Sequence, residues 1–405
     1  MLNKPKFRLK DVLRNVLTYG GALISFSILL LIVVNIFIEG APLMNMNLIM
    51  NNYESVTYVT ELKPDVELDT YEVDIAFGPD VYYSSKWGIA LRDDIDLLGK
   101  NVIFIDYVHE DSPLLVMLNK GVGPETLTLK DKYAVVRIAF IGGPSALSIH
   151  GAQNMIQMLD QVDSLREFEF QTPGGGIRGS IITTLLLIGL TLVFALPIGI
   201  GASIYLNEYA SDNWFNKRLR TFIETLTGVP SIIYGLMGLA LFVPITISLT
   251  SATGGNLISG ALTLAVIVLP VIIRTTEESL KVVPMGYRFA SLALGANETQ
   301  TTFKVVLPNA FSGILTATLL AIGRIIGESA ALVFAIGTTI RDNVSLTDKS
   351  TSLAVHILTM MSDEPANVAL SNTVALIILM MVLVLNLTVK FISKRFMKRY
   401  GVKNR

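Results

Sequence analysis

Six long apolar runs constrain the fold of this chain more than any other feature of its sequence. They cover about residues 19–38, 180–205, 222–247, 257–273, 309–337 and 371–391. A helix needs roughly 20 apolar residues to cross a hydrocarbon core of about 30 Å. Because lipid offers no partner to backbone N–H and C=O groups, such runs cross the membrane as helices. The sequence therefore predicts an all-α polytopic membrane protein with one polar insertion after the first run.

Composition agrees with the membrane class and narrows the chemistry. Of the 405 residues, 51% are hydrophobic and 16% are charged, and the mean hydropathy is +0.56. These values are too apolar for an ordinary soluble domain. The chain has no cysteine, and its histidines His109, His150 and His356 lie far apart. We therefore expect no disulfide, metal site or cofactor, and no nucleic-acid partner.

Charge is distributed unevenly along the chain. Residues 40–176 hold about 20 of the 33 acidic residues and about 9 of the 32 basic ones, so the remainder is basic. Basic clusters lie in the leader (1–18), between the second and third runs, between the fourth and fifth runs, and in the tail (394–405). If the runs alternate, these segments share one side, which predicts a plasma-membrane protein with both termini in the cytoplasm. The first run, 19–38, is expected to stay as a transmembrane anchor because no small-residue cleavage site follows it.

The segment 50–171 is long enough to form an extracytoplasmic α/β domain. Residues 100–107, 133–140 and 165–170 have strand patterns, and residues 150–162 have helical spacing. This order resembles a PDZ domain, in which a loop binds a peptide carboxylate at a sheet edge. The residues in the place of that loop are Trp87, Gly88, Ile89, Ala90 and Leu91. The resemblance implies a peptide partner, and the alternative is a small insert that only packs on the membrane part.

The glycine-rich segment 172–176 is expected to be a flexible joint between the outer domain and the second run. Residues 174–180 read G-x-x-x-x-G-S, which lacks the lysine of a P-loop, and they open a membrane helix instead of following a buried strand. No other stretch carries a Walker motif. We therefore expect this chain to be a non-catalytic subunit, with ATP hydrolysis on a separate partner.

The loop between the fourth and fifth runs has the most informative spacing. The segment 286–308 resembles the EAA loop of ABC importer permeases, in which E-A-A is followed by three residues, Gly, nine residues and I-x-L-P. The positions that this resemblance assigns to ATPase coupling are Tyr287, Phe289, Ala290, Ser291, Leu292, Gly295, Leu307 and Pro308. Phe289 departs from the usual glutamate. A short amphipathic helix that ends at Gly295 can present Tyr287, Phe289 and Leu292 to a partner's groove, whereas the alternative is an ordinary cytoplasmic loop.

Three further stretches extend the resemblance, over residues 172–395, to PstA-type subunits of phosphate permeases. They read GVPSIIYG at 228–235, LPVIIRTTEE at 269–278 and GRIIGESA at 323–330. The resemblance implies a type I ABC importer permease domain at 172–393 and an alternating-access path for inorganic phosphate in a bacterial membrane. It also implies the partners: a dimer of ATP-binding subunits, a PstC-type second permease, an extracytoplasmic phosphate-binding protein and membrane lipid.

Arg324 and Glu328 are the strongest candidates for the substrate path. On one continuous helix they would lie one turn apart, well inside the membrane, where an ionisable group is costly unless it faces a protein-lined path. The guanidinium of arginine matches two phosphate oxygens and stays charged. Arg274, near the cytoplasmic end of the fourth run, is the second cationic candidate. The alternatives are a structural ion pair for Arg324 and Glu328 and a topological role for Arg274.

Two other functions remain open on the sequence alone. A permease for another small anion or nutrient would keep the EAA-type loop without needing Arg324 and Glu328. A membrane-anchored peptide-binding or sensory protein would act through the outer domain and would use the helices only as support. Six apolar runs with a coupling loop are more than an anchor requires.

Overall fold

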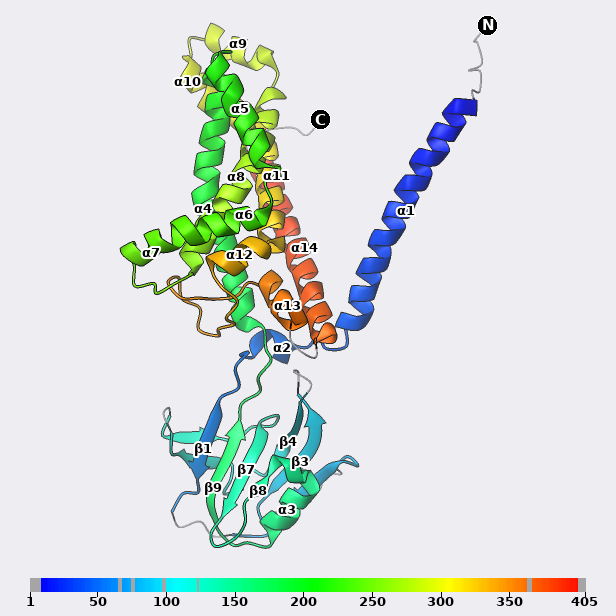
Figure 1. The fold of residues 1–405 in the computed structure, drawn as a ribbon, viewed down its shortest axis with the longest axis vertical. Coiled ribbons are helices and arrows are strands. Elements are labelled where there is room, and N and C mark those ends of the chain that lie inside the picture. Colours follow the sequence, from blue (N-terminus) through cyan, green and yellow to red (C-terminus); the bar gives the residue numbers. More distant parts are fainter. Residues whose placement is uncertain are drawn as a thin grey trace.

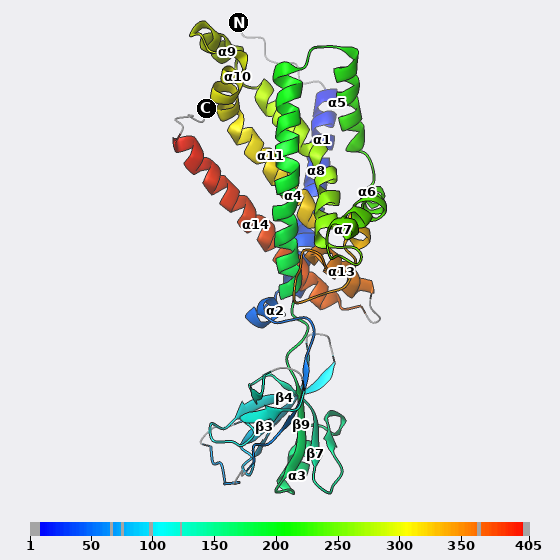
Figure 2. The same ribbon diagram turned by 90° about the vertical axis from the view of Figure 1, so that its left-hand side faces the viewer.

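The computed structural model describes residues 9–64, 68–73, 77–96, 100–121, 124–362 and 366–399. It consists of a bundle of helices with a β domain at one end, and both views place α9 and α10 at the opposite end (Figures 1 and 2). The N-terminal end of α1 and the C-terminal end of α14 also lie at the α9 end (Figure 1). Residues 1–8 of the predicted leader and 400–405 of the predicted tail lie outside the described residues.

The membrane part contains helices and short π-helical segments in the following order. They are α1 (Leu9–Gly40), α4 (Arg178–Ile204), η2 (Tyr205–Tyr209), α5 (Trp214–Leu226), α6 (Ser231–Met237), η3 (Gly238–Phe242), α7 (Val243–Leu249), α8 (Leu257–Lys281), α9 (Met285–Ala293), α10 (Glu298–Thr301), η4 (Thr302–Val306), α11 (Leu307–Gly327), α12 (Ala330–Ala335), α13 (Leu353–Ser362) and α14 (Val368–Arg399). Six stretches of the described residues are long and apolar enough to span a membrane: Arg14–Gly40, Arg178–Tyr209, Ser231–Leu249, Leu257–Val282, Glu298–Gly327 and Val368–Arg395. The prediction of a polytopic membrane protein is thus confirmed.

Three predicted spans have different bounds in the structure, and the fourth of the six continues to Lys281 instead of ending at 273. The third begins at Ser231 and not near 222, because the helix that precedes it ends at Leu226 and the chain then turns through residues 227–230. Pro230 disfavours helical geometry at Val229, which separates α5 from α6. The fifth span was predicted to run to residue 337, but α11 ends at Gly327 because Glu328 is extended, with φ −82° and ψ 119°.

Helix α8 lies at the centre of the bundle and packs against α4 and α11. Its inward face carries small residues and branched aliphatic residues, such as Ala261, Ala265 and Ile272, which are buried. A Cβ on Gly199 of α4 would lie 2.6 Å from the Ile272 side chain, so this glycine allows α4 and α8 to approach closely. The core of the membrane part is therefore the contact of α4, α8 and α11.

Helix α1, by contrast, leaves the bundle and exposes apolar side chains along its length (Figure 1). It is joined to α14 at its outer end, where Asn372 Nδ2 donates to Glu39 Oε2 at 2.6 Å and Thr373 Oγ1 donates to the Gly40 carbonyl at 3.0 Å. A side chain on Gly40 would collide with the backbone of Asn372. Glycine is therefore needed where the two helices meet.

The β domain is one antiparallel sheet with a helix packed on it. Its elements are β1 (Thr57–Glu61), β2 (Val81–Ser84), β3 (Ile89–Ile95), β4 (Asn101–Val108), β5 (Val116–Asn119), β6 (Thr126–Thr128), β7 (Ala134–Phe140), β8 (Ala146–Leu147), η1 (Ser148–His150), α3 (Ala152–Asp160) and β9 (Leu165–Gln171). The strand order is β2-β3-β4-β7-β9-β1-β5-β6, and β8 pairs with β7. Trp87, Phe168 and Met155 are fully buried in its own core. The α/β composition matches the sequence expectation, but nothing in this topology establishes a PDZ fold.

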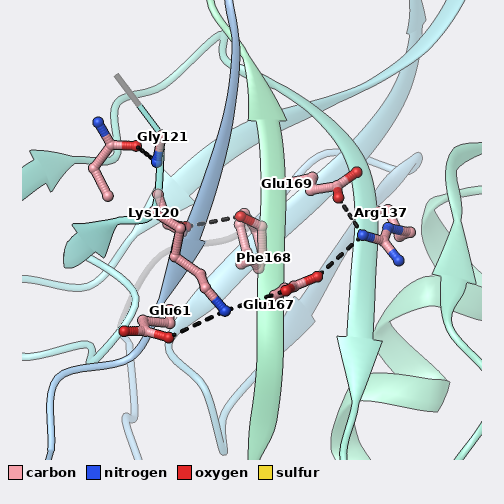
Figure 3. Close-up of polar contacts among 9 residues, drawn as sticks. Glu61, Lys120, Gly121, Arg137, Glu167, Phe168 and Glu169 are labelled. Carbon is pink, nitrogen blue, oxygen red and sulfur yellow. Dashed lines mark hydrogen bonds and ion pairs between the residues drawn. The ribbon is translucent and has the colours of Figure 1, made fainter. Parts of the chain in front are cut away.

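A row of ion pairs crosses one face of this sheet (Figure 3). Lys120 Nζ lies 3.4 Å from Glu61 Oε2 and 3.3 Å from Glu167 Oε1, and Arg137 pairs with both Glu167 and Glu169. Lys120 holds the pKa of the Glu167 carboxyl below its ordinary value. Because this pKa is lowered on folding, the Lys120–Glu167 pair stabilises the folded β domain at neutral pH. This stabilisation is lost as the pH falls through the folded-state pKa of Glu167. The pairs are accessible to water, so each contributes little.

The β domain joins the membrane part through a neck of two paired segments, 48–56 and 172–177. Backbone hydrogen bonds link them, among them Thr172 N–H to the Val56 carbonyl at 3.0 Å and Gly176 N–H to the Asn52 carbonyl at 3.0 Å. Asp342, from the loop after α12, accepts the backbone N–H groups of Tyr53 at 2.7 Å and Glu54 at 3.1 Å. The prediction of a flexible joint at 172–176 was wrong, because these glycines permit close backbone pairing.

Candidate coupling site and translocation path

The coupling segment forms a protruding corner at the end of the bundle opposite the β domain (Figures 1 and 2). Helix α9 has no buried residue, and its exposed side chains include Tyr287, Phe289 and Leu292. Phe289 is 62% exposed and Tyr287 is 51% exposed. Helix α9 thus carries a group of exposed apolar side chains on one short helix.

Gly295 ends this helix as the sequence pattern predicts. Its φ is +87°, and its N–H donates to the Leu292 carbonyl at 2.9 Å, while the next N–H, of Ala296, donates to the Ser291 carbonyl at 3.2 Å. This is the left-handed closure that glycine favours. Ser291 Oγ lies 2.9 Å from Thr301 Oγ1, which ties α9 to α10.

The far end of the motif anchors the corner to the bundle. Leu307 packs on a small cluster that contains Leu280 and Val306. Pro308 lies in the first turn of α11, directly after the π-helical segment η4. The helical stretch Glu298–Gly327 is continuous here, so Pro308 removes one backbone N–H donor from the helix directly after the π-helical segment.

The structure separates the two path candidates that were expected on one helix. Arg324 lies half-buried in the last turn of α11, but Glu328 lies beyond the end of that helix. Glu328 Oε1 accepts the N–H of Ala331 at 3.3 Å, at the start of α12. Among the described residues, no ion pair joins Arg324 to Glu328. The expectation that they share one continuous helix face was therefore wrong.

Arg324 lies beside an open face of α11. A Cβ on either of its neighbours Gly323 and Gly327 would meet no atom within 4 Å. The face of α11 that carries Gly323 and Gly327 is therefore not covered by other parts of this chain that the structure describes.

Arg274 lies in a different place. Its side chain is 60% exposed, and its Nε donates to Glu278 Oε1 at 3.2 Å, one turn further along α8. It borders a cavity of about 250 Å³ between α5 and α8. The charged residues that line this cavity are Arg220, Arg274, Lys281, Glu224, Glu277 and Glu278. Neither Arg324 nor Glu328 lines it, so the structure does not bring the three path candidates into one site.

The segment that resembled a carboxylate-binding loop lies inside the β domain. Trp87, Gly88, Ile89, Ala90 and Leu91 are all buried. The N–H groups of Trp87 and Gly88 donate to the side chain and carbonyl of Ser84. Strand β3 is paired with β2 on one edge and β4 on the other. This pairing contradicts the expectation that a peptide binds at an open edge here.

Comparison with known proteins shows the family to which the membrane part belongs. Residues 195–402 match the model of the binding-protein-dependent transport system inner membrane component family, which is more than half of the chain. The chain belongs to this family. The match begins within α4, so the β domain of this permease lies outside it.

The relatives of the permease are ABC transporter permeases. It is 34% identical over 241 residues to the probable ABC transporter permease protein YqgI of Bacillus subtilis, covering 56% of this chain and 80% of the relative. It is 38% identical over 163 residues to the phosphate transport system permease protein PstA of Yersinia pestis, covering 40% of this chain and 53% of the relative. It is also 37% identical over 162 residues to the phosphate transport system permease protein PstA of Xylella fastidiosa (strain Temecula1), covering 40% of this chain and 54% of the relative. A chain of the MetNI methionine transporter superposes with a TM-score of 0.45 at 22% identity, covering 54% of this chain and 95% of that one.

Two ion pairs at the α9 end of the permease were not predicted from its sequence. Arg288 of α9 pairs with Glu208 of η2, and Arg220 of α5 pairs with Glu277 of α8. The basic clusters that contain these arginines were used only to predict which segments face the cytoplasm. The pairs join residues that are far apart in sequence, so no local motif could reveal them.

Proposed function

We propose that this permease forms half of the membrane path of an ATP-driven importer of inorganic phosphate, and that it couples to a separate ATPase through its EAA-type loop, 286–308. The observation that carries the coupling role is helix α9, which exposes apolar side chains at the end opposite the β domain. The substrate is inferred from the PstA-named relatives. The chain itself hydrolyses nothing in this proposal.

The proposed complex contains a dimer of ATP-binding subunits, a PstC-type second permease and an extracytoplasmic phosphate-binding protein. Tyr287, Phe289 and Leu292 fill a groove of one ATP-binding subunit, as an amphipathic helix does in a hydrophobic cleft. The second permease and lipid cover the bare faces of α1 and of α11. When the ATP-binding subunits close, α9 is pushed and the path changes from one open side to the other.

Arg324 is the proposed contact for the transported anion. Its planar guanidinium can donate two hydrogen bonds to two phosphate oxygens and stays charged at any physiological pH. Glu328, which caps α12, limits how tightly an anion is held nearby. Arg274 supplies positive charge at the cytoplasmic exit. A permease for another small anion is the alternative, since the name of the YqgI relative states no substrate.

Assembly with an ATPase is the direct test of this proposal. The tagged permease, expressed with the ATP-binding subunit and second permease encoded near it, is expected to retain both through purification. Its ATP hydrolysis in nanodiscs should rise when phosphate-loaded binding protein is added. Purification of the permease without an ATPase, or hydrolysis that responds equally to sulfate-loaded and phosphate-loaded protein, would contradict the coupling role or the substrate respectively.

The proposed orientation puts the β domain outside the cell and both termini inside. The chain has no cysteine, so a single introduced cysteine reports directly on which side of the membrane its position lies. Ile149 in the β domain and Asp212 between α4 and α5 have side chains of similar exposure, both 83%. Ile149→Cys is expected to react with a membrane-impermeant maleimide in spheroplasts, and Asp212→Cys only after permeabilisation. The opposite labelling pattern would show that the protein is inserted in the reverse orientation.

A further inference from the structure

Arg288 of α9 makes four side-chain hydrogen bonds at the end of the bundle opposite the β domain. Its Nη2 donates to Glu208 Oε1 at 2.8 Å and its Nε donates to Oε2 at 3.2 Å. Nη1 donates to the Val283 carbonyl at 2.6 Å, and Nη2 also donates to the Leu280 carbonyl at 3.0 Å. One guanidinium thus links α9 to two other elements, the C-terminal end of α8 and η2 after α4.

These contacts are shielded from water, which distinguishes them from the surface pairs of the β domain. The side chains of Arg288 and Glu208 are 13% and 10% exposed. Breaking a shielded, two-pronged ion pair costs far more than breaking an exposed one. Arg288 also donates to two carbonyls near the end of α8, and the Leu280 carbonyl additionally accepts the N–H of Val283 at 3.3 Å. Glu208 is further fixed by Asn207, whose Nδ2 donates to its Oε1 at 2.6 Å.

A second arginine holds the same π-helical segment from the other side. Arg220 of α5 donates to the Leu206 carbonyl and pairs with Glu277 of α8, and Lys281 Nζ lies 2.8 Å from Glu277 Oε1. The end of α4 is therefore fixed to α8 on both sides. Because α4 and α8 also pack together with α11, which carries Arg324, these helices form one connected core.

We propose that the Arg288–Glu208 pair is a strut that transmits movement of the coupling helix α9 to α4 and α8, with Arg288 as a positioning residue for transport. The inference rests on the proposed coupling role of α9. Without the strut, α9 keeps the turn at Gly295 and its link to α10 through Ser291 and Thr301. It can then still bind an ATPase, but its displacement is absorbed at the junction of residues 282–284 and does not reach the path.

The strut is tested by separating ATPase binding from coupling. Arg288→Lys keeps the positive charge but cannot form the fork to Glu208 together with both carbonyl bonds. In the assembled complex in nanodiscs, the ATPase is expected to stay bound while phosphate-stimulated hydrolysis and uptake both fall about tenfold, the scale expected for loss of a shielded charged hydrogen bond. Arg218→Lys, at an exposed arginine on α5, is the matched control and should retain the wild-type stimulation.

If Arg288→Lys does not fold, a covalent link between positions 208 and 288 in place of the ion pair provides a second test. The double variant Glu208→Cys with Arg288→Cys is expected to be uncoupled, and a short bifunctional maleimide should restore part of the stimulation by joining the two thiols. Arg288→Cys alone, treated in the same way, should gain nothing. Wild-type stimulation in Arg288→Lys, or no gain after verified cross-linking, overturns the strut. Absence of stimulation in the wild-type complex would instead defeat the proposed function itself.

Discussion

Replacing Gly295 with aspartate is expected to leave the permease inserted in the membrane and to abolish phosphate-stimulated ATP hydrolysis by the complex. Gly295 has φ +87°, a conformation that costs most residues with a side chain about 1 to 2 kcal/mol but that aspartate, like asparagine, adopts more readily. The permease itself has room for a side chain, because a Cβ there would meet no atom within 4 Å. The main effect therefore falls on the contact with the ATPase, where an unpaired charge costs about 1 to 3 kcal/mol.

Two companion variants separate the backbone effect from the charge effect. Gly295→Asn has a side chain that tolerates the left-handed region and carries no charge, so it should keep most of the stimulation. Gly295→Ala adds strain without polarity and should fall between the asparagine and aspartate variants. Hydrolysis with and without phosphate-loaded binding protein is measured on complexes of equal ATPase content. Full stimulation in Gly295→Asp would show that this turn does not lie at the contact.

Replacing Arg324 is expected to produce the second large effect, on uptake. Arg324→Gln removes the charge and should nearly abolish phosphate uptake, whereas Arg324→Lys keeps the charge but loses the planar fork and should reduce it strongly. Loss of one hydrogen bond to a charged group costs about 1.5 to 3 kcal/mol, or roughly tenfold to a hundredfold in rate. Uptake is measured in cells that lack their own phosphate permease and is normalised to inserted protein.

Glu328 provides the control that separates anion contact from a structural ion pair. If Arg324 only neutralised Glu328, the double variant Arg324→Gln with Glu328→Gln would recover much of the lost uptake, because no buried charge would be left alone. Since Glu328 instead accepts the N–H of Ala331, we expect the double variant to stay as impaired as Arg324→Gln. Recovery would discard the anion contact.

The features that could be predicted from the sequence were those that depend on residues adjacent in the chain. Apolar runs of membrane length located all six spans, since hydrocarbon thickness sets a length that can be read directly. The turn at Gly295 followed from a local motif whose geometry only glycine adopts easily. The end of α11 at Gly327 was missed because Glu328 lies in an apolar run with no proline, and only its cap on Ala331 marks the break.

Features that depend on distant residues escaped prediction. Asp342 binds two N–H groups nearly 290 positions away in sequence, and Arg288 and Glu208 are 80 positions apart. The glycines at 172–176 were taken as a hinge because glycine is flexible in isolation. In the fold, a Cβ on Gly176 would collide with the backbone of Asn51, so the same absence of a side chain makes the neck close-packed. Strand β3 was assigned an open edge because the pairing of β2 with it could not be read from local pattern.

Transport in proteoliposomes that contain the purified complex shows whether the permease moves phosphate at the expense of ATP hydrolysis. Radiolabelled phosphate is supplied with the binding protein on one side, and ATP or a non-hydrolysable analogue on the other. Accumulation of labelled phosphate is expected to require ATP and to disappear in Arg324→Gln. It should be competed by unlabelled phosphate but not by sulfate, molybdate or amino acids. Accumulation of another solute in preference to phosphate, or phosphate entry that is independent of ATP, would contradict the proposed function.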